Sequence, residues 1–172
     1  MTTLGIDPGV RFVGWVLLVD GDLADQGQWS VTTRKGTGQW QHSLTEHIRL
    51  AGHLLDELRP DVVGIEAIQV QHGMLGAGGE TPNMARARSQ AAMTQRTSEL
   101  IAMLAALAGA IGATVHLIHP ATGLARLGCK RGATDRDISA AYNRRWGQEL
   151  LVREHHIARA AGVALAAMGG KR

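Results

Sequence analysis

The stretch LGIDPGVRFVGWVLL, residues 4–18, decides the fold because it sets two apolar runs on either side of a Pro-Gly turn. The pattern predicts one strand over residues 2–7 and a second over 11–19. The first of these strands ends on a carboxylate, Asp7. Burying a carboxylate is costly unless a metal ion, a basic side chain or backbone amides meet it. We therefore expect Asp7 to face a positive partner.

The rest of the chain alternates strand-like and helix-like patterns in a simple order. Turn signals, apolar periodicity and stop residues predict a third strand ending near 31, helices over 39–58, 82–111 and 154–168, strands over 61–68 and 113–120, and a helix capped by Thr134. This order describes a mixed α/β sheet flanked by helices. With no repeat or linker in 172 residues, we expect a single domain over 1–172.

Composition narrows the setting in which the chain works. Hydrophobic residues make up 45% of it, enough to bury a substantial core. No stretch reaches the length of an apolar membrane span and no signal peptide opens the chain, so we expect no membrane association. The single cysteine, Cys129, excludes an internal disulfide and favours a reducing cytoplasm.

Charge is divided unevenly along the chain. Residues 1–85 hold 5 Lys or Arg against 10 Asp or Glu, whereas residues 86–172 hold 13 against 5. Arginine makes up 15 of the 18 basic residues and suits bidentate contact with phosphate. The basic half indicates an anionic partner such as nucleic acid, or equally a solvated face without a partner.

Two carboxylates occupy matched settings, Asp7 in GIDPG and Glu66 in VVGIEAI. If their strands are neighbours, the two side chains converge, and hard oxygen ligands in that arrangement bind Mg²⁺ or Mn²⁺. The alternative is that each acid caps a loop or pairs with an arginine. On the final helix, His156 and Arg159 share one face because they lie three residues apart. If that face is buried, Arg159 needs an acceptor, for which Asp7 and Glu66 are the candidates; if it faces solvent, Arg159 needs none.

Other catalytic patterns are weaker. The remaining histidines show no zinc-ligand spacing. The glycine-rich segment GMLGAGGETPN lacks the Lys-Ser/Thr pair of a phosphate-binding P-loop. Zinc chemistry and nucleotide hydrolysis are therefore not expected.

Four segments together resemble a known family. LGIDPGVRFVGW resembles the opening of RuvC-type Holliday-junction resolvases, and VVGIEAIQVQHG followed by MARARSQAAMTQ looks like the second acidic motif of that family. VHLIHPATGLARLGCKRGATDRDI is similar to its strand and basic loop, and HHIARAAGVALA to its terminal helix. The resemblance covers nearly the whole chain in the expected order. It implies a ribonuclease-H-like fold, a homodimer, and Mg²⁺-dependent cleavage of four-way DNA junctions with Mn²⁺ as a substitute.

The resemblance also implies roles for individual residues. Asp7 and Glu66 fall on the first two metal-binding acids, and His156 falls on the first member of a pair in the last helix. Arg159 stands where the second member, an Asp, is expected, and a guanidinium cannot ligate Mg²⁺ and would repel it. Two neighbours of His156 are substitute candidates for the missing ligand: Glu154 and His155.

Basic residues complete the implied site. Arg136 falls where the family has a Lys near the scissile phosphate, and there it would offset charge in a two-metal hydrolysis; the alternative is a solvated Arg at a helix start. Phosphate contacts are expected from the arginines and lysine around the basic loop and the long helix: Lys130, Arg131, Arg86, Arg88 and Arg126.

Three readings of the function remain open from the sequence. The first is a structure-selective endonuclease that places symmetric nicks in four-way junctions. The second is a catalytically impaired dimer that grips the junction, with Arg159 supplying the missing metal charge at Asp7 and Glu66. The third is a related ribonuclease-H-like protein acting on another nucleic acid. A small chain of this kind fits a bacterium or a phage, and the sequence names no branch-migration partner.

Overall fold

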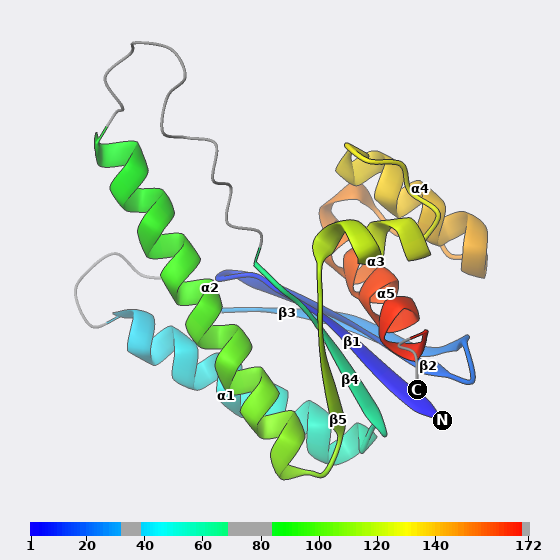
Figure 1. Cartoon of the computed structure of the whole chain (residues 1–172), viewed down its shortest axis with the longest axis horizontal. Coiled ribbons are helices and arrows are strands. Elements are labelled where there is room, and N and C mark those ends of the chain that lie inside the picture. The colour runs from blue at the N-terminus through cyan, green and yellow to red at the C-terminus, as the bar shows by residue number, and fades with distance from the viewer. Residues whose placement is uncertain (32–38, 69–83, 170–172) are drawn as a thin grey trace.

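The computed structural model describes residues 1–31, 39–68 and 84–169. Its centre is a five-stranded sheet in the order β3-β2-β1-β4-β5 (Figure 1). The strands are β1 (Thr2–Pro8), β2 (Phe12–Val19), β3 (Asp22–Ser30), β4 (Val62–Glu66) and β5 (Thr114–Ile118). The β1–β2 and β2–β3 pairs are antiparallel, whereas β1–β4 and β4–β5 are parallel. This mixed sheet confirms the predicted α/β fold class.

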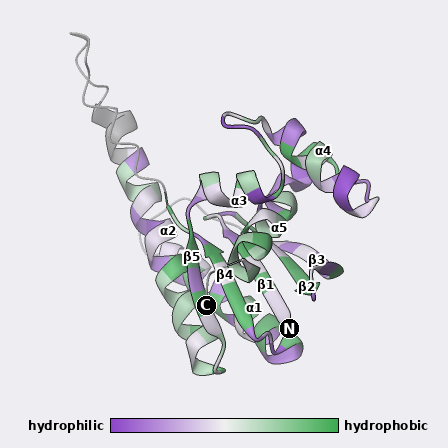
Figure 2. Ribbon diagram, turned by 45° about the vertical axis from the view of Figure 1, so that its right-hand side comes forward, coloured by the Kyte–Doolittle hydropathy of each residue, from purple (hydrophilic) through white to green (hydrophobic). Residues whose placement is uncertain are grey.

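Helices cover both faces of the sheet. On one side lie α1 (Gln39–Leu58) and α2 (Met84–Ala110); on the other lie α3 (Pro120–Arg126), α4 (Asp135–Trp146) and α5 (His155–Met168), preceded by a 3-10 turn, η2 (Val152–Glu154). Successive side chains of β1 point to opposite faces of the sheet. Leu4 and Ile6 pack toward α1 and α2, while Gly5 and Asp7 face α5. Figure 2 shows α5 more hydrophobic than α4, in keeping with the more central position of α5.

Three glycines let α5 lie directly on the sheet. Gly14, Gly5 and Gly64 belong to the adjacent strands β2, β1 and β4, and all three face α5. A Cβ at Gly5 would overlap the carbonyl oxygen of Ala160, and one at Gly14 would overlap the backbone of His156. The missing Cβ atoms therefore bring the helix backbone into contact with the strands. This close approach fixes where the first turns of α5 stand relative to the ends of β1 and β4.

A buried histidine ties α1 to the turn between β1 and β2. His47 is fully buried, accepts a hydrogen bond from Trp29 Nε1 at Nδ1 (3.0 Å), and donates from Nε2 to the carbonyl oxygen of Val10 (3.1 Å). These two bonds require the neutral Nε2–H tautomer. Burial lowers the pKa of His47, consistent with that neutral state. His47 is thus a structural residue that holds the turn following Asp7.

The structure corrects one element and supports others. The sequence analysis ends a strand at Pro120 and assigns no element to residues 121–126. In the structure these residues form the short helix α3, in which Pro120 takes the first position and His119 Nδ1 accepts from the Ala121 amide at 3.2 Å. The predicted Thr134 cap is present as a reciprocal capping box with Asp137. In the part of the chain that the structure describes, no helix is long and apolar enough to cross a membrane.

Candidate functional site

Asp7 and Glu66 meet at the carboxyl ends of two neighbouring parallel strands. Ile6 pairs with Ile65 in the β1–β4 register. Asp7 directly follows Ile6, and Glu66 directly follows Ile65. Asp7 is 6% exposed, and the side chain of Glu66 is 13% exposed. Two nearly buried carboxylates therefore point to the same side of the sheet, the side that α5 covers.

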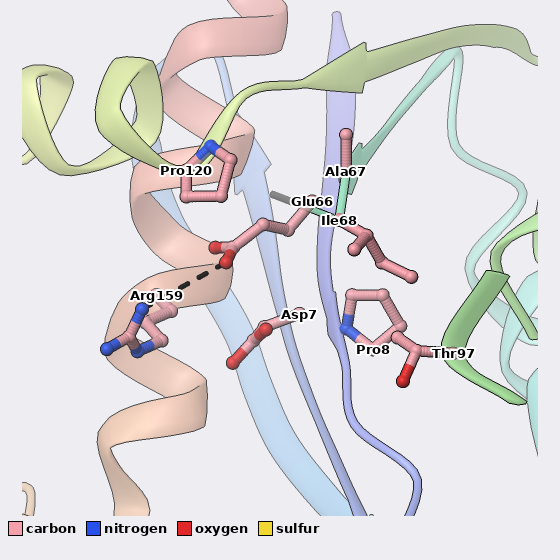
Figure 3. Close-up of a pocket in the computed structure, with 8 residues that line it drawn as sticks. All are labelled: Asp7, Pro8, Glu66, Ala67, Ile68, Thr97, Pro120 and Arg159. Atoms are coloured by element: carbon pink, nitrogen blue, oxygen red, sulfur yellow. Dashed lines mark ion pairs between the residues drawn. The ribbon is translucent and has the colours of Figure 1, made fainter. Parts of the chain in front are cut away.

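The two acids line a pocket of about 240 Å³. Figure 3 shows their carboxylates and the guanidinium of Arg159 turned toward one another. The remaining lining residues come from the ends of β1 and β4 and from α2 and α3: Pro8, Ala67, Ile68, Thr97 and Pro120. Two strands and helices from both layers thus contribute side chains to the pocket.

His156 is the direct partner of Asp7. Its Nδ1 lies 2.6 Å from Asp7 Oδ2. Because an ionised carboxylate only accepts hydrogen bonds, Nδ1 carries the proton in this contact. Such a bond orients the imidazole and leaves the Nε2 of a neutral ring free to accept a proton or bind a cation. Asp7 therefore faces a histidine, and not Arg159 as its hydrogen-bonding partner.

Arg159 links two acids from different elements. Its Nη1 lies 4.0 Å from Glu66 Oε1, and its Nη2 donates to Asp135 Oδ1 at 3.1 Å. Asp135 begins α4 and also lies 3.8 Å from Nε2 of His155. Sequence reasoning names Glu66 as a candidate acceptor but misses Asp135. No spacing rule connects Asp135 to Arg159, because only the packing of α4 on α5 brings them together.

When both acids are ionised, the pair carries more negative charge than its surroundings offset. Burial and the neighbouring charge of Asp7 raise the pKa of Glu66 to about 8, although Arg159 acts in the opposite direction. An additional positive charge in the pocket would stabilise the ionised pair. Hard carboxylate oxygens with this excess charge suit a divalent cation such as Mg²⁺ or Mn²⁺.

The donor set fits one such cation, held by Asp7 and Glu66. Within the described residues, no group of three or more His, Cys, Asp or Glu side chains is arranged to hold a metal ion. Glu154 lies in η2, where its carboxylate accepts from the Leu151 amide at 2.8 Å, and it does not line the pocket. Nδ1 of His155 lies 3.0 Å from the Val152 carbonyl oxygen.

The predicted DNA-contacting residues fall in several places. Lys130 and Arg131 line a second pocket of about 410 Å³, together with Arg144 of α4. Arg136 is exposed in the first turn of α4 and does not line the acid pocket. Arg126 is exposed in the last turn of α3, away from both pockets. The side chains of Arg86 and Arg88 in α2 lie outside the described residues.

With this geometry established, comparison with known proteins identifies the fold. No protein-family model and no curated protein matches the chain. Among solved structures, it is similar to a Thermus thermophilus RuvC structure, with a TM-score of 0.69 and 17% identity over 96% of this chain and 92% of that one. It is also similar to T. thermophilus RuvC in complex with a Holliday-junction substrate, with a TM-score of 0.69 and 15% identity over 96% of this chain and 91% of that one. The chain has a RuvC-like fold.

A mitochondrial relative of that fold is also similar. The yeast mitochondrial Holliday junction resolvase Ydc2 gives a TM-score of 0.57 at 15% identity, covering 96% of this chain and 77% of that one. The likeness to RuvC spans nearly the whole chain, as the four sequence segments predicted. At these identities it establishes the ribonuclease-H-like fold, while the roles of individual residues depend on the geometry of this chain.

Proposed function

We propose that this protein is a DNA endonuclease that resolves four-way junctions by divalent-metal-dependent phosphodiester hydrolysis, leaving paired symmetric nicks. One observation carries the proposal: two nearly buried carboxylates converge at the carboxyl ends of β1 and β4, in an open pocket, on a RuvC-like fold. A structural role for the pair is disfavoured because burial and mutual repulsion raise the pKa of Glu66 to about 8. Perturbed acids in a cleft are typical of active sites.

The three charged residues that line the pocket, together with His156 beside Asp7, each have a task in this reaction. Asp7 and Glu66 hold Mg²⁺ or Mn²⁺, which when bound lowers the pKa of water and neutralises charge on the phosphate. Asp7 also fixes the ring of His156 through the 2.6 Å contact, so that Nε2 can accept a proton from an attacking water. Arg159 lines the same pocket and offers its guanidinium to an oxygen of the scissile phosphate.

Branched DNA is the proposed partner, and a homodimer the proposed assembly. Symmetric nicks on two strands need two copies of the site, which a two-fold dimer supplies. Lys130 and Arg131 on their glycine-bounded loop give sequence-independent phosphate contacts, with salt-dependent affinity. Arg136, exposed on the first turn of α4, adds a further phosphate contact. A motor that moves the branch point is compatible with this function, although no chain residue identifies one.

A second function is favoured by Arg159. A guanidinium 4.0 Å from Glu66 supplies one positive charge to the acid pair without any metal. In that case, the dimer binds junctions but does not cut them. The repulsion between the guanidinium and an arriving cation is the physical basis of this alternative.

Cleavage and binding assays on one substrate separate the two functions. A synthetic four-way junction is incubated with Mg²⁺ or Mn²⁺ for cleavage and, in parallel, with EDTA for a gel shift. Symmetric nicks that disappear in Asp7→Asn establish the endonuclease. Binding without nicks, together with cleavage gained by Arg159→Asp at unchanged DNA affinity, establishes the binding protein. If the chain binds junctions no better than duplex of equal length, both functions are wrong.

A further inference from the structure

A row of stacked side chains borders the acid pocket on its β2 side. The guanidinium carbon of Arg11 lies 5.5 Å from the ring centre of Phe12. The Phe12 ring is stacked with His156 at 6.1 Å between centroids and 24° between planes, and His156 lies 4.2 Å from His155. We call these four residues, Arg11, Phe12, His156 and His155, the aromatic row. It runs from the turn after β1 to the start of α5.

Phe12 stands out in this row because it is exposed. It begins β2 two residues before Gly14, and both face α5. The backbone of α5 covers Gly14 at His156, whereas Phe12 stands at the strand end and keeps 37% of its surface exposed. An exposed aromatic side chain contributes little to a core, but it presents a flat apolar surface to a ligand.

The row connects this surface to the chemistry of the pocket. His156, which stacks on Phe12, is the same residue that contacts Asp7 at 2.6 Å. Phe12 is therefore one side chain away from the carboxylate pair. A nucleotide whose phosphate enters the pocket would carry its base, or that of its neighbour, to the aromatic row.

We propose that the aromatic row is a binding site for one unstacked nucleobase of the branched DNA, with Phe12 as its stacking surface. A nucleobase fits because base–aromatic stacking needs only a flat π surface and tolerates any sequence. Arg11, exposed and on a flexible stem, turns from the Phe12 ring to a flanking phosphate. The proposal rests on the proposed DNA-binding function and adds a reason for preferring branched DNA, since a closed duplex has no unstacked base to offer.

The test combines photocrosslinking with binding measurements in EDTA, where cleavage does not occur. Four-way junctions carry 5-iodouracil in place of thymine within two nucleotides of the branch point, and the crosslinked peptide is mapped by mass spectrometry. Anisotropy gives affinities for the junction and for a duplex of equal length. The variants are Phe12→Leu, which keeps an apolar side chain, and Phe12→Trp, which restores an aromatic surface. Val19→Ala is the matched control, because Val19 is 39% exposed at the opposite end of β2.

The expected result is a crosslink on Phe12 that Phe12→Leu abolishes and Val19→Ala retains. Phe12→Leu should weaken junction binding by about 5- to 150-fold, the range for loss of one stacked base, and leave duplex binding unchanged. Phe12→Trp should restore junction binding. If the wild type binds junctions while Phe12→Leu binds them equally well, the inference is wrong and the proposed function stands. If the wild type shows no preference for junctions, both are overturned.

Discussion

Replacing Glu66 by glutamine should stabilise the metal-free protein at alkaline pH and do so progressively less as the pH falls. Burial and the charge of Asp7 raise the pKa of Glu66 from 4.5 to about 8 in the folded protein. Between these pH values, unfolding releases a proton from this carboxyl group. Its contribution to stability is therefore fully present below pH 4.5 and is lost as the pH rises to about 8.

The size of the effect follows from the same pKa. A tenfold change in a proton-dissociation constant is worth about 1.4 kcal/mol, so a pKa of about 8 in place of 4.5 amounts to about 5 kcal/mol across the window. That is a large part of the 5–15 kcal/mol that typically stabilises a domain. The difference in unfolding free energy between the wild type and Glu66→Gln should therefore change by several kcal/mol across this pH range.

Urea unfolding in EDTA at pH 5, 6.5 and 8.5 measures this difference. The control is Glu57→Gln, which neutralises an exposed carboxylate on α1 and should give a difference that hardly varies with pH. Adding Mg²⁺ should stabilise the wild type at pH 8.5 more than Glu66→Gln. A difference between wild type and Glu66→Gln that stays constant from pH 5 to 8.5 would refute the assignment of a buried, repelled carboxylate at this position.

Three further predictions test other parts of the structure. In thermal unfolding, Gly5→Ala should destabilise the fold by about 1–3 kcal/mol, because the added Cβ meets the backbone of α5. Gly52→Ala, where an added Cβ meets nothing, should stabilise the fold by about 0.5–1 kcal/mol. Equal effects of the two substitutions would argue against contact between α5 and the sheet. Asp135→Asn should weaken Mn²⁺ binding, measured by electron paramagnetic resonance, because it leaves Glu66 as the acid paired with Arg159; the same loss in an Arg159→Gln background would show that Asp135 acts through its own charge. The stability of the wild type relative to His47→Gln should fall in urea unfolding as the pH drops below about 6.5, since the folded pKa of His47 lies below that ordinary value.

Much of the fold is legible in the sequence because its signals are local. The alternation around Gly5 and the Pro-Gly turn predict β1 and β2, and helical periodicity predicts 39–58, which is α1. The short helix α3 escapes prediction for an equally local reason. Its seven residues are too few for a periodic pattern, and Pro120 reads as a stop although it is the start of a helix.

The site is less predictable because its contacts join distant segments. Asp7 and Glu66 are recognisable as acids at strand ends, and their convergence follows once β1 and β4 are neighbours. The partners of those acids depend on how α5 lies on the sheet and how α4 lies on α5. The choice of His156 for Asp7, and of Asp135 for Arg159, is therefore a property of packing that no spacing in the sequence displays.

The three-glycine contact makes the distance between α5 and the acid pair a constant of the scaffold. With the helix backbone resting on the strands, position 159 cannot move closer to Glu66, so its side chain alone must span the gap. The long arginine side chain brings Nη1 of Arg159 to 4.0 Å from Oε1 of Glu66. A shorter aspartate there would face Glu66 with a second carboxylate, and such a pair would hold a divalent cation in place of the guanidinium charge. A single substitution at position 159 would thus replace the charge of a guanidinium by that of a bound cation, without any adjustment of the backbone.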